Sequence, residues 1–245
     1  MNRLILLLVL FALGCKKSED RSCWKFNGST IDKKVDLSDF HKIDLGAFLN
    51  YHLIHDSSSF VVLTGGENVL NSVCTTVIDG RLTITNENKC KFLRSLKKII
   101  SVEIHYKSLD EIIYQGSYSL TNEGTLSSPK LDVILREGSG SVDLLVNCIN
   151  LEVSAEPSWT DYTIRGNCNY ARLSAKGNAF GDTRELQVLN DLIVISKGTN
   201  DLKIGTNSAN FLKCETWSSG NVYYTDTPGS IEWSNYGTGK LLQGN

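Results

Sequence analysis

The sequence predicts an all-β protein whose chain winds as a β-solenoid with about 20 residues in each coil. Helical periodicity is nearly absent, and short runs rich in β-branched residues, such as 60–63, 82–85 and 192–195, are separated by Gly, Asn and Ser. Residues of one type also recur at steps of twenty. The composition, with 41% hydrophobic and 21% charged residues and a net charge of −2, is that of a globular protein. It excludes a disordered chain, a coiled coil and a strongly basic nucleic-acid binder.

The recurrence is clearest in the second half of the chain. Steps of twenty from position 147 to position 207 meet four side-chain amides, namely Asn147, Asn167, Gln187 and Asn207. Coils of a solenoid lie about 4.8 Å apart, so equal residues in one column touch their copies and amides can hydrogen-bond along it. An antiparallel sandwich has turns every 8–12 residues and no reason to space amides equally. A second column, at positions 142, 162, 182, 202 and 222, is apolar except at Asp182. If that coil is about two residues shorter, Phe180 takes the place of Asp182 and the whole column is apolar.

The N-terminus has the pattern of a secretory signal. Arg3 precedes an apolar run over 4–13, which is too short to cross a membrane as a mature helix. The end of this run, Ala-Leu-Gly followed by Cys15, resembles a bacterial lipoprotein signal, in which the cysteine is lipidated and becomes the mature N-terminus. We therefore expect a signal peptide over 1–14, a lipid-anchored tether over 15–22, and an outer-membrane lipoprotein. The acidic pair in the tether resembles the export tags of surface lipoproteins, which would expose the protein at the cell surface.

The mature chain is predicted to form one domain over 23–245, with the first coils over 23–107 and more regular coils over 108–241. Its six remaining cysteines include no C-x-x-C pair and no histidine at zinc-ligand spacing, so we expect no metal. Cys148 and Cys168 are twenty residues apart, and stacking in register would bring their Cα atoms within reach of a disulfide. Stacked free thiols are the alternative.

No catalytic set stands out, and neither a cofactor nor enzymatic activity is expected. The chain has no G-x-S-x-G elbow, and His52 and His55 would lie on opposite faces of a strand. Asp161 and Asp201 would lie two coils apart, about 9.6 Å, with Gly181 between them. That separation is at the edge of the range for an inverting carboxylate pair, so a carbohydrate-active enzyme is one alternative. Solvated acids at the corners of the coils are the favoured interpretation.

Two groups of residues are candidates for contact with a ligand or partner. The first packs five cations into ten residues and could meet phosphates, acidic glycans or lipid headgroups, although lysines also protect sheet edges. The second is a concentration of aromatic residues near the C-terminus, which could stack on sugars or on a partner, or could pack as a cap on the last coil. The cations are Lys89, Lys91, Arg94, Lys97 and Lys98. The aromatic residues are Trp217, Tyr223, Tyr224 and Trp233, with Tyr236 nearby.

Several short segments, in a fairly specific order and spacing over about residues 36–241, resemble the family called "putative auto-transporter adhesin, head GIN domain", a domain of unknown function. The resemblance implies a right-handed parallel β-helix, export and a role in adhesion. We therefore expect a non-catalytic cell-envelope lipoprotein that acts as an adhesin or binding module for a glycan or an envelope protein. The other alternative, besides the enzyme, is an assembly protein that pairs through a sheet edge. The matching segments are 40–43, 80–84, 86–90 with Arg94, 101–104, 109–112 before Gly116, 219–224, 228–229 and 237–240.

Overall fold

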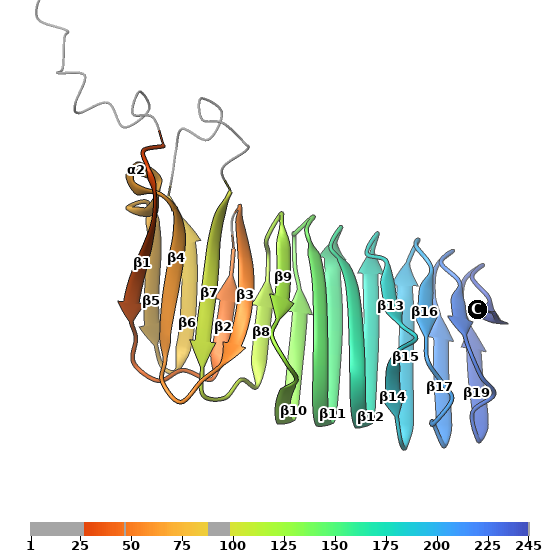
Figure 1. Ribbon diagram of the computed structural model, residues 1–245. Coiled ribbons are helices and arrows are strands. Elements are labelled where there is room, and N and C mark those ends of the chain that lie inside the picture. Colours follow the sequence, from red (N-terminus) through yellow and green to blue (C-terminus); the bar gives the residue numbers. More distant parts are fainter. Residues whose placement is uncertain (1–26, 47, 88–98, 245) are drawn as a thin grey trace, which may run out of the picture.

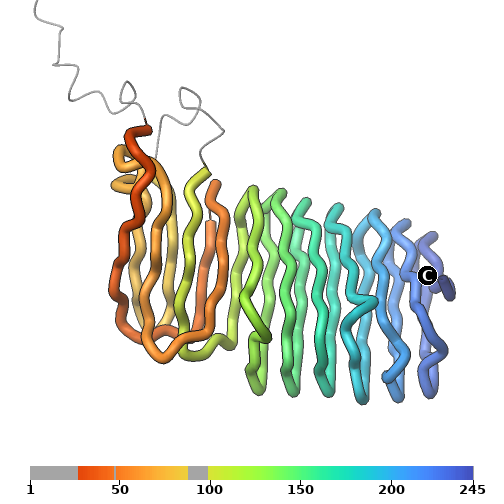
Figure 2. The backbone as a smooth tube through the Cα atoms, viewed as in Figure 1, coloured from red at the N-terminus to blue at the C-terminus, as the bar shows by residue number. Residues whose placement is uncertain are grey.

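The strands of the protein stack along one axis, as Figures 1 and 2 show for the computed structural model, which describes residues 27–46, 48–87 and 99–244. From β8 to the C-terminus, the coils follow one another in chain order. The one helix within the described residues, α2 (Glu67–Leu70), lies at the N-terminal end of the stack. No described helix has the length and hydropathy needed to span a membrane. The all-β solenoid expected from the sequence is confirmed.

The stacked strands form two main faces. We call face A the one that contains β8, the second halves of β10, β11 and β12, and then β15, β17 and β19. Face B contains β9, the first halves of β11 and β12, and then β13, β16, β18 and β20. Every pairing within these two sets is parallel, as in a solenoid. The bounds are β8 (Glu111–Tyr114), β9 (Ser119–Asn122), β10 (Leu126–Leu135), β11 (Ser141–Ser158), β12 (Asp161–Gly177), β13 (Gly181–Thr183), β14 (Leu186–Val188), β15 (Asp191–Gly198), β16 (Leu202–Ile204), β17 (Phe211–Thr216), β18 (Val222–Tyr224), β19 (Ser230–Asn235) and β20 (Leu241–Gln243).

The predicted columns exist, with one shift in register. Asn147 is paired with Asn167, and Asn167 with Gln187, while Asn207 lies in a turn outside the paired strands. In the second column Tyr162 is paired with Gly181, which in turn is paired with Leu202. The expected replacement of Asp182 by Phe180 is therefore wrong, because that coil is one residue shorter rather than two. Gly181 suits the place, since a Cβ there would overlap the ring of the buried Tyr162.

The core lies inside the coils and is continuous along the stack. Side chains alternate in burial along each strand, as in β11, where Val142, Leu144 and Val146 are inside and their neighbours are outside. The inward residues of each coil pack on those of the next, for example Leu144 on Ile164. Burial of these apolar columns is the main term that stabilises the stack, because each coil alone could not cover its own apolar side chains.

The N-terminal end differs from the expectation that 23–107 forms simple coils. In this part of the chain β2 pairs in parallel with β6 and β8, and β3 pairs in parallel with β7 and β9. The β2–β3 coil therefore lies between the β6–β7 coil and the β8–β9 coil. Antiparallel pairs join β1 to β4, β4 to β7, and β5 to β6. These strands cap the first coil and close its end (Figure 1). The bounds are β1 (Thr30–Asp36), β2 (Lys42–Leu45), β3 (Leu49–His55), β4 (Phe60–Gly66), β5 (Val73–Ile78), β6 (Arg81–Asn86) and β7 (Ile100–Tyr106).

The hairpin between β5 and β6 has a local cause. Its two loop residues, Asp79 and Gly80, have φ values of 50° and 71°. Two-residue hairpin loops of this kind need positive φ at both positions, which Asp-Gly adopts readily. The antiparallel turn at this point is therefore set by the sequence itself.

Candidate binding surfaces on the solenoid

The outer surface of face A carries a groove, which we call the face A groove, with a cavity volume of about 330 Å³. Two outward columns form it. One contains Asn150 and Tyr170, and the other contains Asp132, Glu152 and Arg172, each residue paired with its neighbour on the next coil. Tyr170 belongs to the lining of the groove, and 44% of this residue is exposed. The register of the coils thus places an aromatic ring beside a row of charged groups.

Charges of both signs line the face A groove together with Tyr170. The Lys130 Nζ lies 2.6 Å from Asp132 Oδ2, and this hydrogen bond raises the pKa of the lysine above its ordinary value. The other carboxylate oxygen of Asp132, Oδ1, is buried and has no hydrogen-bond partner in the described part of the chain. Arg172 Nε lies 3.8 Å from Glu152 Oε1, and Asp191 is exposed at the rim. The groove therefore offers an apolar ring face with hydrogen-bond donors and acceptors around it, which suits a ligand rich in hydroxyl groups.

A second surface lies at the corner that follows face A near the C-terminus. The rings of Trp217 and Tyr236 are stacked, with centroids 4.1 Å apart and planes at 24°. The Lys197 Nζ lies 4.9 Å from the Trp217 ring centroid, and Trp217 Nε1 donates a hydrogen bond to Glu215 Oε2 at 3.1 Å. Trp217 is 44% exposed, as Tyr170 is, and Tyr236 covers one face of its ring.

The other predicted aromatic contacts are spread over different sides of the last coils. Trp233 stands on the inward column above Cys214, and its Nε1 donates to Thr216 Oγ1 at 3.2 Å. Tyr224 follows the buried Ile204 in its column and packs against the core. Tyr223 is its neighbour along β18 and is paired with Lys203. The structure therefore does not bring Trp217, Tyr223, Tyr224 and Trp233 into one site.

The predicted cation cluster and the anchor lie outside the described residues. Lys89, Lys91, Arg94, Lys97 and Lys98 fall within 88–98, and Cys15 precedes residue 27. Their proposed contacts stay predictions.

The two cysteines that the sequence analysis paired occupy neighbouring positions, but both are free thiols. Residues paired in register on parallel strands keep their Cβ atoms about 4.8 Å apart, whereas a disulfide requires about 3.8 Å. Burial raises the pKa of Cys148 to about 11 and that of Cys168 to about 12, and the same effect raises the pKa of Cys214 to about 12. These thiols therefore stay protonated at neutral pH and act as small apolar core residues.

The acids considered for catalysis hold the corners of the coils together. Asp161 Oδ1 accepts a hydrogen bond from the backbone N–H of Phe180 at 3.1 Å. Asp201 Oδ1 accepts two from Asn221, one from its backbone N–H at 2.9 Å and one from Nδ2 at 3.1 Å. Gly181 does not lie between them as expected, because it belongs to the Tyr162 column. Each carboxylate thus bonds the next coil, which favours a structural role over an acid–base pair.

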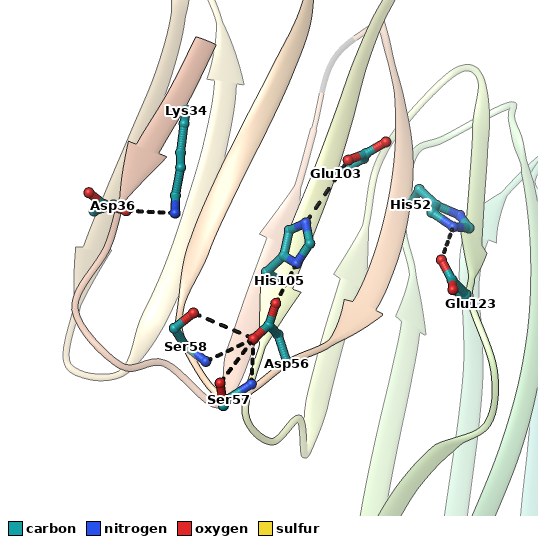
Figure 3. A network of polar contacts seen from close by, with 9 residues as sticks. All are labelled: Lys34, Asp36, His52, Asp56, Ser57, Ser58, Glu103, His105 and Glu123. Carbon is teal, nitrogen blue, oxygen red and sulfur yellow. Dashed lines mark hydrogen bonds and ion pairs between the residues drawn. The ribbon is translucent and has the colours of Figure 1, made fainter. Parts of the chain in front are cut away.

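His105 and His52 make polar contacts near the N-terminal cap, shown in Figure 3. His105 Nδ1 lies 3.0 Å from Asp56 Oδ2, and this hydrogen bond, together with those from Ser57 and Ser58, holds the pKa of Asp56 below its ordinary value. The His105 ring also stacks on Phe60, with centroids 3.9 Å apart. His52 lies on the neighbouring strand and contacts Thr121 at 2.9 Å. The network fastens the β3–β4 turn to β7, and the described residues contain no group of three or more ligands arranged for a metal.

Comparison with solved structures supports the same architecture. The chain is similar to a "putative adhesin" from Bacteroides fragilis NCTC 9343, with a TM-score of 0.77, 20% identity and coverage of 88% of this chain and 97% of that one. It is also similar to a "putative adhesin" and a "putative lipid binding protein" from Parabacteroides distasonis ATCC 8503. Their TM-scores are 0.64 and 0.65, their identities 18% and 16%, and the shares covered 89% and 90% of this chain and 98% of each of theirs. At these identities the likeness shows the fold.

The sequence itself matches one family model. No curated protein matches the sequence. The model described as "putative auto-transporter adhesin, head GIN domain" matches residues 39–228, most of the chain. The expected resemblance is confirmed, and the chain belongs to this head GIN domain family.

Proposed function

We propose that the protein is a non-catalytic adhesin of the cell envelope that binds a glycan in the face A groove. Residues 1–14 would be removed as a signal peptide, and lipidated Cys15 would hold the mature chain on the outer membrane, with the domain facing outward. Membership of an adhesin-like family supports a place at the envelope. The names of the similar solved structures, adhesins and a lipid-binding protein, support a binding role over catalysis.

The shape of the molecule fits an anchored binding module. The first described residues lie at one end of the stack and the C-terminal end lies at the other, as Figure 1 shows. A lipid at the N-terminus would therefore leave the whole length of face A open to large ligands. A stack of paired strands is also stiff, so little ordering free energy is lost when a ligand binds to it.

The observation that carries the proposal is the exposed Tyr170 ring within a groove of polar groups. The apolar face of a sugar ring can pack on such a ring while its hydroxyl groups bond to Asn150, Asp191 and the Glu152–Arg172 pair. The volume of about 330 Å³ is at the lower end of that for small-ligand sites and leaves room for a short stretch of a glycan chain.

A glycan array followed by affinity measurement tests this proposal on the purified mature protein. We expect binding to at least one glycan, and Tyr170→Ala is expected to weaken it at least about tenfold, because the stacking platform is lost. Asp161→Ala is the matched control, since that acid bonds a corner away from the groove, and its affinity should equal that of the wild type.

Three results would contradict the proposal. One is the absence of binding to every glycan on the array. Another is full affinity in Tyr170→Ala, which would place the ligand elsewhere. The third is turnover of a bound glycan that disappears in Asp161→Ala, which would instead support the carbohydrate-active enzyme.

A further inference from the structure

No described strand covers the C-terminal end of the solenoid, in contrast to the capped N-terminal end. Ile231 and Trp233 in β19 continue inward columns whose previous members, Leu212 and Cys214, are fully buried. Ile231 is 41% exposed and Trp233 is 44% exposed, although both lie at the end of an inward column. Leu241 in β20 likewise lies above the buried Val222 and is only partly covered. The last coil therefore presents a cross-section of the apolar core to its surroundings.

The same end carries two edge strands. Within the described residues β19 is paired only with β17, and β20 only with β18. The outer edge of each strand has backbone N–H and C=O groups that can pair with another strand. A partner for this end must therefore supply both strands and apolar side chains.

We propose that the partner is a second copy of this chain, docked end to end about a twofold axis. The axis would pass between Glu232 and the partner's Glu232, so that β19 pairs with its own copy in antiparallel fashion. In this register Ile231 faces the partner's Trp233, and Trp233 faces the partner's Ile231. Both side chains are on the inward side, so the two cores join into one. A twofold contact of this kind is closed and does not propagate into fibres.

The sequence around Glu232 gives the reason for choosing a second copy. Apolar residues stand one position on either side of Glu232, at 231 and 233, so the strand is complementary to itself when reversed about that residue. The twofold axis brings the two Glu232 side chains together on the outer surface. Each of them lies 3.3 Å from its own Lys213, which offsets their repulsion.

This inference does not depend on a glycan in the face A groove, which is on the side of the stack and not at its end. One consequence does rest on the proposed function. Because the anchor would lie at the opposite end from β19, an end-to-end dimer would carry its two lipid anchors at its two far ends and could join two membranes.

Sedimentation of the purified mature protein over a range of concentrations tests the dimer. We expect a monomer–dimer equilibrium, with a dissociation constant on the order of 10–100 μM for a contact of this modest size. Trp233→Lys should weaken it at least about tenfold, because a charge would have to be buried at the junction. Tyr170→Ala serves as the matched control and should leave the equilibrium unchanged. A wild-type protein that stays monomeric at several hundred μM, about tenfold above this range, would overturn the proposal, as would a dimer that persists in Trp233→Lys.

Crosslinking tests the geometry without relying on a destabilising variant. With Cys15, Cys23, Cys74 and Cys90 replaced by serine, Glu232→Cys should be joined to its copy by a short bismaleimide, and mass spectrometry should find the 232–232 peptide. Ser154→Cys, on face A but far from the end, should give no such product. Equal crosslinking of both variants, or none at position 232, would refute the twofold contact.

Discussion

Replacing Gly166 with alanine is expected to lower the free energy of unfolding by about 3 kcal/mol or more. Gly166 has a φ of 111°, a conformation that residues with a side chain rarely adopt, and a Cβ at this position would overlap the carbonyl oxygen of Val146 on the previous coil. The two coils could accommodate the methyl group only by separating, which would strain the parallel pairing of β11 and β12. Urea unfolding followed by circular dichroism measures the loss.

Gly124→Ala is the matched control for this prediction. Gly124 also has a positive φ, 64°, but a Cβ there would meet no atom within 4 Å. Gly124→Ala should therefore lower the free energy of unfolding by only about 1 kcal/mol, the cost of a positive φ for a residue with a side chain. Equal losses at both glycines would mean that the close approach of coils at Gly166 does not exist in solution.

Ile164→Ala is expected to cost about 2–5 kcal/mol, because it removes three carbon atoms from the inside of the stack. Ile164 is fully buried and is paired with the equally buried Leu144 on the previous coil. Neighbouring coils cannot collapse into the space without breaking their register, so most of the cavity should remain.

The control is an isoleucine on the other side of the strand. Ile195 in β15 points outward and is only partly buried, so Ile195→Ala should cost less than about 1 kcal/mol. A larger loss for Ile195 than for Ile164 would mean that the inside and outside of the coil have been interchanged.

The regular coils could be predicted from the sequence because the two patterns that define them, a constant coil length and the alternation of inward and outward residues, repeat along the chain. Asn147, Asn167 and Gln187 are aligned by a coil of constant length, and the alternation in β11 distinguishes inside from outside without further information. The prediction was wrong where the coil changes length by one residue, at Gly181, because a glycine leaves no side-chain pattern to count.

The N-terminal cap could be predicted only in part. Asp79 and Gly80 between two β-branched runs are a recognisable hairpin signal, which the expectation of simple coils did not use. The position of β2 and β3 between β6–β7 and β8–β9 depends on pairings between distant residues, such as Lys42 with Glu111. Such pairings follow from the fit of whole strands and leave no local trace in the sequence.

The candidate site was only partly visible for a related reason. Tyr170 belongs to a column that a step of twenty identifies, but its groove arises from two adjacent columns on four coils. The aromatic residues near the C-terminus are close in sequence, yet Tyr223 and Tyr224 are consecutive in one strand and so point to opposite sides.

The central claim is that distant segments lie in neighbouring coils, and pairs of spin labels on the outward column of face A test it most directly. With exposed native cysteines replaced by serine, labels at Lys42 and Lys213 should be about 29 Å apart, since six strand pairings separate them. Labels at Glu111 and Lys213 should be about 5 Å closer, because Glu111 lies one coil nearer. A label at Glu111 that is as far from Lys213 as the label at Lys42, or farther, would contradict the stacked order of the coils.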